Sequence, residues 1–354
     1  MAPPERLLPA LRGVLYSGRI SEGEQVESFE REFAAFIGYP HVMSFYSGTA
    51  ALHTALILAG VGPGDEVVST AMTAEPTNLA ILYAGGSVVW ADIDPTNGNI
   101  DPASIEAKLT SRTRVIMVVH YGGIPASIQR IRTIGARHGV RVVEDAAHAL
   151  GARYAGLPIG RHSEYVMFSF QAIKHLTTVD GGMLACANPD DISRGRRIRW
   201  FGIDRNAPRT EVDVKEIGFK YHMNNVNAAI GSVQLAHISP VIDRHIENGR
   251  FFDHALANIP GLETPRWDTQ AEPSYWFYTV LAERRDDLSR RLTERGIGNS
   301  LAHRRNDLHA VFATSRSELP GLDRFYARML HIPCGWWVSD EDREYIAATI
   351  KAGW

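Results

Sequence analysis

Short apolar runs alternate with longer stretches of helical periodicity through the first two thirds of the chain. Seven of these runs predict β-strands, at residues 41–46, 66–70, 87–93, 114–120, 140–145, 164–170 and 182–187. Their content of Val, Ile, Met and Phe is nearly continuous, without the alternation that marks a strand with one face in water. We therefore expect strands that are buried on both faces.

Helical patterns separate most of these strands. They occupy residues 47–60, 75–86, 125–139 and, more briefly, 146–151. Strands that alternate with helices form a mainly parallel sheet covered on both faces, and such sheets bind ligands at the carboxyl ends of their strands. The pattern thus predicts an α/β fold whose seven-stranded sheet carries the functional residues along one edge.

The pattern changes near residue 240. A long amphipathic helix over residues 241–259 is followed by a strand at 276–284 and by helices at 286–296 and 340–354. We expect two domains, a large one at residues 20–240 and a smaller α+β one at 241–354. Residues 1–19 are expected to pack with the smaller domain.

Composition narrows the class of protein. The 354 residues are 45% hydrophobic, and 37 Lys and Arg stand against 40 Asp and Glu, for a net charge of −3. These values exclude a disordered chain and a general nucleic-acid binder. Two cysteines, no signal peptide and no apolar run of about 20 residues indicate a soluble, cytoplasmic protein without a membrane partner.

Lys174 is the first candidate for chemistry. It follows the strand at 164–170 by four residues and precedes a polar turn and a pair of glycines. The apolar walls at the mouth of a parallel sheet lower the pKa of a lysine and make it a suitable Schiff-base amine. A surface lysine without a chemical role is the alternative.

Asp145 ends the strand at 140–145 and should lie at the same edge of the sheet. A carboxylate there suits the protonated ring nitrogen of pyridoxal phosphate (PLP), a cofactor that acts as an electron sink. If a helix begins at Asp145, His148 lies on the same helical face and flanks the cofactor ring. The alternatives are a helix N-cap aspartate and a solvated histidine.

Ser47, Gly48 and Thr49 link the first strand to a helix. The unpaired N–H groups of a helix N-terminus, together with small hydroxyl side chains, suit a phosphate group. The same tripeptide is also an ordinary helix start. The order of the three features is more specific than the tripeptide alone, because a possible phosphate site, a carboxylate and a lysine follow one another along a single sheet.

The chain resembles the DegT/StrS family of sugar-nucleotide aminotransferases, which are PLP enzymes of fold type I. The resemblance covers residues 17–237 and rests on an ordered set of motifs. These are SGRISEGEQVESFEREFAAFIG, SGTAALHTALILAGVGPGDEVV, WADIDPTNGNID, VVHYGGIP, VVEDAAHALG, FSFQAIKHLTTVDGGML and KYHMNNVNAAIGSVQL. The ordered set is far more specific than any one motif.

The resemblance implies roles for individual residues. Lys174 forms the internal aldimine, Asp145 binds the pyridine nitrogen, and His148 lies beside the ring hydroxyl. The residues implied to bind the phosphate are Gly48, Thr49 and Ser169. The family builds each site from two subunits, which implies a homodimer. Lys220 stands where a family asparagine reaches the phosphate of the neighbouring subunit.

The chain departs from the family pattern around the pocket. Ala74 replaces an aromatic residue that usually stacks on the cofactor. The candidates to line the substrate pocket there are Glu75, Pro76 and Asn78. His303 lies where family members bring the C-terminal domain over the active site, and Arg304 follows it in place of the customary tyrosine.

The implied activity is that of a PLP-dependent aminotransferase. It moves an amino group from glutamate to a nucleotide-linked keto-deoxysugar through a pyridoxamine intermediate. Two alternatives stay open. A sugar dehydratase of the same family has histidine in place of the lysine, so Lys174 argues against it, although His175 is adjacent. A PLP-binding regulator without turnover is the other alternative.

Two further features have uncertain roles from sequence. Arg194, Arg196, Arg197 and Arg199 either bind a substrate diphosphate or form a solvated helix face. His331 and Cys334 have the spacing of metal ligands. Two residues do not make a metal site, and we expect no bound metal.

Overall fold

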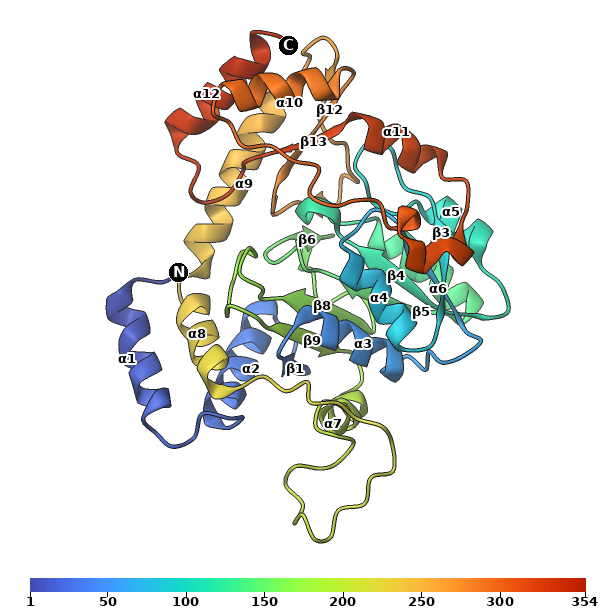
Figure 1. The fold of residues 1–354 in the computed structure, drawn as a ribbon, viewed down its shortest axis with the longest axis vertical. Helices are drawn as coiled ribbons and strands as arrows, with labels where there is room; N and C mark the ends of the chain where they lie inside the picture. The colour runs from blue at the N-terminus through green and yellow to red at the C-terminus, as the bar shows by residue number, and fades with distance from the viewer.

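The central element of the computed structural model, which describes residues 1–354, is a seven-stranded sheet (Figure 1). Its strands are β1 (Val42–Phe45), β2 (Glu66–Thr70), β3 (Ser87–Ala91), β4 (Thr113–Val119), β5 (Arg141–Asp145), β8 (Tyr165–Ser169) and β9 (Gly182–Cys186). In space they follow the order β1-β9-β8-β5-β4-β2-β3. Only β9 runs antiparallel to its neighbours. All seven predicted strands and the mainly parallel sheet are confirmed.

Helices cover both faces of this sheet. They are α2 (Glu24–Ile37), α3 (Gly48–Leu58), α4 (Glu75–Tyr83), α5 (Pro102–Lys108), α6 (Ile128–His138), α7 (Pro189–Ile198) and α8 (Asn225–Leu235). Successive residues of β4 enter different cores, since Ile116 belongs to the core that contains Phe29 of α2 whereas Met117 belongs to the one that contains Leu52 of α3. Burial on both faces explains why the strands lack a polar alternation.

The chain after residue 237 forms a second sheet with its own helices. They are α9 (Ile238–Ala255), α10 (Arg285–Glu294) and α12 (Asp340–Lys351), and the strands are β10 (Leu262–Glu263), β12 (Tyr278–Ala282) and β13 (Met329–Ile332). The strands follow the order β10-β12-β13. Phe252, Val280 and Ile346 belong to a separate core there. The strand and the three helices predicted for this region are confirmed.

Shorter elements connect the two regions. A small sheet of order β11-β6-β7 joins β6 (Arg153–Tyr154) and β7 (Leu157–Pro158) to β11 (Ala271–Glu272). The 3-10 turns are η1 (Tyr121–Gly123), η2 (Asn306–Leu308) and η3 (Ala310–Ser315), and η3 leads to α11 (Pro320–Arg328). None of the helices combines the length and the apolar content that a membrane crossing requires.

The boundary expected at residue 240 falls in the first turn of α9, but the chain beyond it returns to the central sheet. The ring centroids of Phe312 in η3 and Trp90 in β3 are 5.5 Å apart. The carboxylate of Asp92 accepts the N–H of Gly321 at 2.7 Å and of Leu322 at 2.9 Å, which satisfies the first turn of α11. The C-terminal region therefore covers part of the large core in addition to forming its own.

The N-terminal helix α1 (Pro4–Leu15) lies beside α8 (Figure 1). The backbone N–H of Ala2 extends this contact by donating to the side chain of Gln234. The structure thus corrects the expectation that residues 1–19 pack with the C-terminal region. The amphipathic pattern of a helix predicts that one face is covered, but it does not identify the element that covers it.

Candidate active site

Lys174 lies in the loop that follows β8, at the carboxyl edge of the sheet. Its backbone N–H donates to the carbonyl of Gln171 at 3.0 Å, which fixes a tight turn. Burial lowers the pKa of the Lys174 amine to about 8, although the nearby carboxylate of Asp145 opposes this shift. The amine therefore exchanges protons close to neutral pH, as a nucleophile and proton carrier requires.

Asp145 is the last residue of β5, which pairs with β8. Its buried carboxylate accepts the hydroxyl of Thr77 at 2.7 Å and the backbone N–H of Ala147 at 3.0 Å. Burial raises the pKa of Asp145, while these two hydrogen bonds and the charge of Lys174 oppose the shift. A buried carboxylate that no arginine neutralises fits a protonated pyridine nitrogen.

The sequence patterns did not identify Thr77. It lies in the first turns of α4, on a segment that the sequence placed at the pocket only through its neighbours Glu75, Pro76 and Asn78. Its hydroxyl also bonds that of Thr73 at 2.9 Å. A threonine early in a helix has no sequence signal for contact with a carboxylate 68 positions away.

Residues 146–151 form turns and not the helix that the sequence pattern predicted. The Asp145 carboxylate accepts the N–H two residues later, so the side chain terminates the strand in an Asx-turn. His148 is nevertheless brought into the site, where burial lowers its pKa well below the usual range and nearby Lys174 adds to the effect. The solvated alternative for His148 is wrong. Its Nδ1 is buried and has no hydrogen-bond partner in the chain, as a ligand-binding nitrogen would be.

Two of the residues predicted to bind a phosphate, Gly48 and Thr49, lie at the N-terminus of α3. Ser47 caps the helix by accepting the N–H of Ala50 at 3.1 Å, and the first N–H groups, those of Gly48 and Thr49, have no intrahelical acceptor. A methyl group on Gly48 would stand 3.2 Å from Cβ of Ser169, and one on Gly182 would stand 2.7 Å from the backbone nitrogen of Gly48. Glycine at both positions lets the start of α3 approach β8 and β9 closely, and the unpaired N–H groups there suit a phosphate.

His303 reaches the site from the C-terminal region, as expected. Its ring is parallel to that of His148, with centroids 5.7 Å apart and an interplanar angle of 4°. Burial lowers the pKa of His303 to about 4 and Lys174 adds to this, whereas Glu75 opposes it. Glu75 therefore faces the same site, and its Oε1 also lies 3.4 Å from Nε2 of His309. Both site histidines are neutral at physiological pH.

Asn78 has a different position from the one expected of a pocket residue. It is fully buried, and its amide accepts the hydroxyl of Ser69 at 2.6 Å and donates to the carbonyl of Thr70 at 3.0 Å and to Asn306 Oδ1 at 2.8 Å. These bonds join α4 to β2 and to the C-terminal region. The structure thus corrects the expected substrate contact at Asn78 to a structural link.

Lys220 is exposed on the segment that runs beside β1. The carbonyl of its neighbour Tyr221 accepts the N–H of Tyr46 at 2.9 Å, so the backbone beside Lys220 lies close in space to the residues that precede α3. Its side chain forms no hydrogen bond or ion pair within the chain. The contact with a second subunit stays a prediction.

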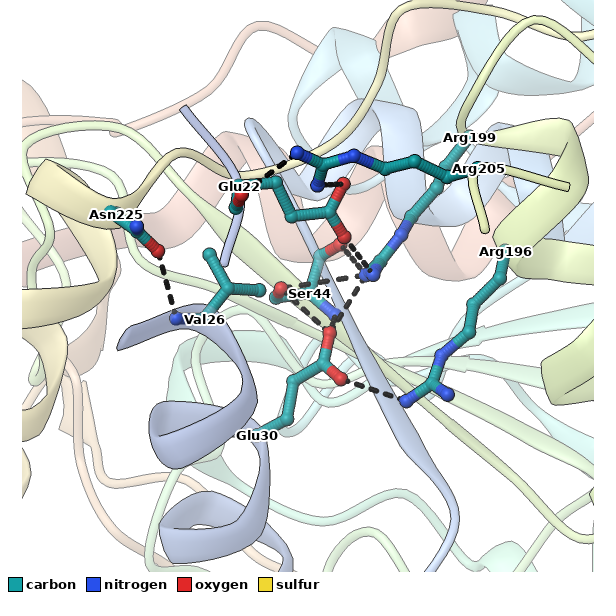
Figure 2. A network of polar contacts seen from close by, with 8 residues as sticks. All are labelled: Glu22, Val26, Glu30, Ser44, Arg196, Arg199, Arg205 and Asn225. Carbon is teal, nitrogen blue, oxygen red and sulfur yellow. Dashed lines mark hydrogen bonds and ion pairs between the residues drawn. The ribbon is translucent and has the colours of Figure 1, made fainter. Parts of the chain in front are cut away.

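Arg196 of α7 and Arg199, the residue that caps this helix, belong to a network of polar contacts (Figure 2). Arg199 is only 4% exposed and donates to Glu30 at 2.7 Å, to the carbonyl of Ser44 at 2.7 Å and to Glu22 at 2.5 Å. Arg196 reaches the other oxygen of Glu30 at 3.0 Å. Burial favours a raised pKa for Glu30, but the arginines and Ser44 outweigh it and lower the pKa.

The sequence left two alternatives for these arginines, a site for a substrate diphosphate and a solvated helix face, and this network decides between them for Arg199. Arg199 is neither solvated nor free to bind a diphosphate, because it clamps α2 to β1 and α7. Arg194 and Arg197 are more exposed and pair with Glu216. Arg199 is therefore a structural clamp, and an arginine that two carboxylates neutralise is unavailable to a substrate anion.

His175 does not replace Lys174 as the reactive residue. Its Nε2 lies 3.3 Å from the carbonyl of Ser274, and its ring lies against His245 of α9 with centroids 4.4 Å apart. The adjacent histidine thus serves the contact with α9, which removes the observation that kept a dehydratase open.

The assembled groups are those of a PLP site at one edge of a fold type I sheet. The chain matches the DegT/DnrJ/EryC1/StrS aminotransferase family over residues 4–351. The protein belongs to this family. Its members are PLP-dependent transaminases, and the chain is a sugar aminotransferase with PLP as cofactor.

Individual family members are similar over nearly their whole length. The sugar aminotransferase CalS13 from Micromonospora echinospora is 39% identical, with a TM-score of 0.97 over 100% of this chain and 98% of CalS13. The spore coat polysaccharide biosynthesis protein SpsC of Bacillus subtilis (strain 168) is 32% identical over 95% of this chain and 91% of SpsC. Spr1654 from Streptococcus pneumoniae, in its PLP-form, is 25% identical, with a TM-score of 0.91 over 99% of this chain and 97% of Spr1654.

Proposed function

We propose that this sugar aminotransferase moves an amino group from glutamate to a nucleotide-linked keto-deoxysugar. The observation that carries the proposal is the convergence of Lys174, Asp145 and the N-terminus of α3 at one edge of the sheet, in the order that the family motifs follow. Bound PLP supplies an electron sink that stabilises negative charge at the carbon next to the amino group. The residues that would hold it are Gly48, Thr49, Asp145, His148, Ser169 and Lys174.

The chain's own residues divide the work of proton transfer. Asp145 holds a proton at the ring nitrogen, and the hydroxyl of Thr77 orients the carboxylate for that contact. Lys174, as a neutral amine, accepts the proton from the α-carbon of the donor and later returns one to the acceptor. A pKa of about 8 suits both directions, since neither form of the amine is rare near neutral pH.

The diphosphate of the acceptor needs a cation other than the arginines at residues 194–199, because those arginines are paired with glutamates. Arg304 is exposed directly after His303, at the position where the family has a tyrosine, so it is available to an anion at the mouth of the site. The neutral imidazoles of His148 and His303 suit the hydroxyl groups of a sugar better than a second anion. These features support a nucleotide-linked sugar as the acceptor.

A homodimer with shared sites is part of the proposal. The loop of residues 202–219 projects from the body of the molecule (Figure 1) and ends at Lys220, whose amine is free within the chain. Exposed aromatic and aliphatic side chains lie near it, at Tyr46, Phe201 and Ile217. Grouped apolar exposure of this kind marks protein contact surfaces.

The test separates donor, acceptor and catalyst. Holoenzyme is incubated with glutamate and a panel of nucleotide-linked and free keto-sugars and a cyclitol ketone, and amine transfer is measured by mass spectrometry. We expect an amino sugar on the nucleotide with release of 2-oxoglutarate, and no product from Lys174→Ala. Transfer only to free sugars or to the cyclitol would contradict the nucleotide-linked acceptor. A deoxygenated keto product without nitrogen would favour the dehydratase.

A further inference from the structure

The indole ring of Trp276 lies against the amine of Lys174. Nζ of Lys174 is 3.8 Å from the ring centroid of Trp276, which precedes β12 in the C-terminal region. An ammonium within about 6 Å of the centre of a tryptophan ring is attracted to the electron-rich face of the ring. The position of this aromatic residue is unexpected from sequence, since the family's stacking aromatic would stand at Ala74.

Several contacts fix the indole at this place. Its Nε1–H donates to the carbonyl of Ile173, the residue before Lys174, at 2.9 Å. The ring also stacks on His148, with centroids 3.9 Å apart and planes 15° from parallel. The side chain is therefore oriented by three partners, all of which belong to the loops at the carboxyl edge of the central sheet.

The backbone of Trp276 is held by the paired glycines of η1. Its N–H donates to the carbonyl of Gly122 at 2.9 Å. Both glycines have positive φ, and a methyl group on Gly123 would stand 2.8 Å from the nitrogen of Tyr275 and 2.9 Å from that of Trp276. Glycine is needed here so that the two backbones can approach. The fold thus delivers Trp276 to Lys174 with little freedom.

We propose that Trp276 is a positioning residue for Lys174: its ring holds the ammonium when the amine is free, and its N–H fixes the loop that carries the lysine. The other groups that face Lys174 are Asp145, His148, His175 and His303. The three imidazoles are kept neutral by burial. The Asp145 carboxylate and the indole face are therefore the two groups that stabilise the ammonium.

The first experiment measures the pKa of Lys174 directly. The full-length chain, freed of cofactor, is acetylated at a series of pH values, and the labelling of the peptide with Lys174 is followed by mass spectrometry. The chain has five lysines, so each is resolved. Because the ring stabilises the charged form, Trp276→Leu should lower the pKa of Lys174 by about one pH unit, and Trp276→Phe, which keeps a ring face, by less than about half of that.

A second readout separates the ring from the indole N–H. Trp276→Phe and Trp276→Leu both lose the hydrogen bond to Ile173, so hydrogen exchange of the backbone amides around Lys174 should be faster in both variants. Trp336→Phe, which changes an exposed tryptophan elsewhere, is the matched control and should alter neither quantity. Circular dichroism and thermal unfolding establish that each variant is folded.

Three results would overturn the proposal. An unchanged pKa of Lys174 in folded Trp276→Leu would remove the ring from the argument, and a raised pKa would show that the indole acts by excluding water. Equal exchange rates in wild type and Trp276→Phe would remove the hydrogen bond to Ile173. None of these readouts depends on the identity of the amino donor or of the sugar, so failure here is distinct from failure of the proposed function.

Discussion

Lys174 and Asp145 carry opposite charges in a place that disfavours both. Burial lowers the pKa of the lysine and raises that of the aspartate, so each group is moved toward its neutral form. Asp145 would hold the protonated ring nitrogen of bound PLP, which would supply a positive charge beside the carboxylate, and Lys174 would hold the cofactor through its amine. In the cofactor-free protein the charged forms of both residues are therefore less stable than they would be in water. Binding of PLP should raise the stability of the folded protein.

The cost of the buried amine is measurable through Lys174→Met. Folding lowers the pKa of Lys174 from 10.5 to about 8, so the folded chain binds this proton less tightly than the unfolded chain. Burial of the charged amine therefore destabilises the folded state to its full extent below pH 8. This destabilisation disappears as the pH rises toward 10.5. At pH 7 the free energy of unfolding of the cofactor-free variant, measured by urea titration, should be about 3 kcal/mol higher than that of wild type.

The difference between Lys174→Met and wild type should vanish near pH 10.5. Lys215→Met, at an exposed position, is the control and should change stability by less than about 0.5 kcal/mol at either pH. A variant that is less stable than wild type at pH 7 would contradict the electrostatic account.

Thr77 should matter through Asp145. Thr77→Val removes a hydroxyl whose hydrogen bond favours the anionic form of Asp145. The pKa of Asp145 then rises further, and the anion that would keep the ring nitrogen protonated is less stable. We expect the donor half-reaction, followed by absorbance in stopped flow, to slow by about 10-fold, in line with the loss of one hydrogen bond to a charged group. Thr77→Ser keeps the hydroxyl and should behave like wild type. Equal rates for the valine and wild-type enzymes would contradict this role.

At the scale of elements, the sequence predicts best where a pattern is long and locally determined. The seven strands are found because both of their faces are buried, which leaves an unmistakable apolar run. Strands of two residues, such as β6 and β11, are too short to show any pattern of apolar and polar positions in the sequence. Residues 146–151 have helix-forming alanines, but the side chain of Asp145 bonds the backbone two residues later and turns the chain.

The same distinction applies to the site. Lys174, Asp145 and Gly48 were predictable because each follows a strand or opens a helix, so the sheet topology alone brings them to one edge. Thr77 and Trp276 were not predictable, since their roles arise from contacts with residues 68 and 102 positions away. Asn78 was placed wrongly because adjacent positions on α4 face different surroundings.

The clamp around Glu30 should determine how firmly α2 and α7 are attached. Arg199→Met leaves the Glu30 and Glu22 carboxylates without their buried partner, and we expect a loss of about 3 kcal/mol in the free energy of unfolding. Arg194→Met removes a more exposed pair with Glu216 and should cost less than about 1 kcal/mol. Urea titrations of the two variants at neutral pH make the comparison. Similar losses for both would mean that the network contributes no more than a surface ion pair.

At the scale of the whole molecule, the proposed site is incomplete without a second chain. Lys220→Ala should weaken PLP binding by about 10-fold, measured by equilibrium dialysis, because a charged contact to the phosphate is lost. Lys215→Ala lies in the same exposed loop and should leave the affinity unchanged.

Mixing variants tests whether the contact crosses subunits. Lys174→Ala and Lys220→Ala chains are unfolded, refolded together and assayed at a PLP concentration too low to load Lys220→Ala alone. A hybrid dimer has one site with both lysines, so about a quarter of wild-type activity should appear in the mixture. If each active site belonged to one chain, the mixture would be no more active than the sum of its parts.

Two contacts bear on any attempt to divide the chain. The ring of Phe312 packs on that of Trp90, and the carboxylate of Asp92 caps the start of α11. β3 is the outermost strand at one edge of the central sheet, and η3 packs against it. A fragment that stopped at residue 240 would keep every strand of the central sheet and yet expose this unpaired edge as a template for other molecules. Such a fragment should aggregate by sheet extension, so the last third of the chain also protects this edge from pairing with other molecules.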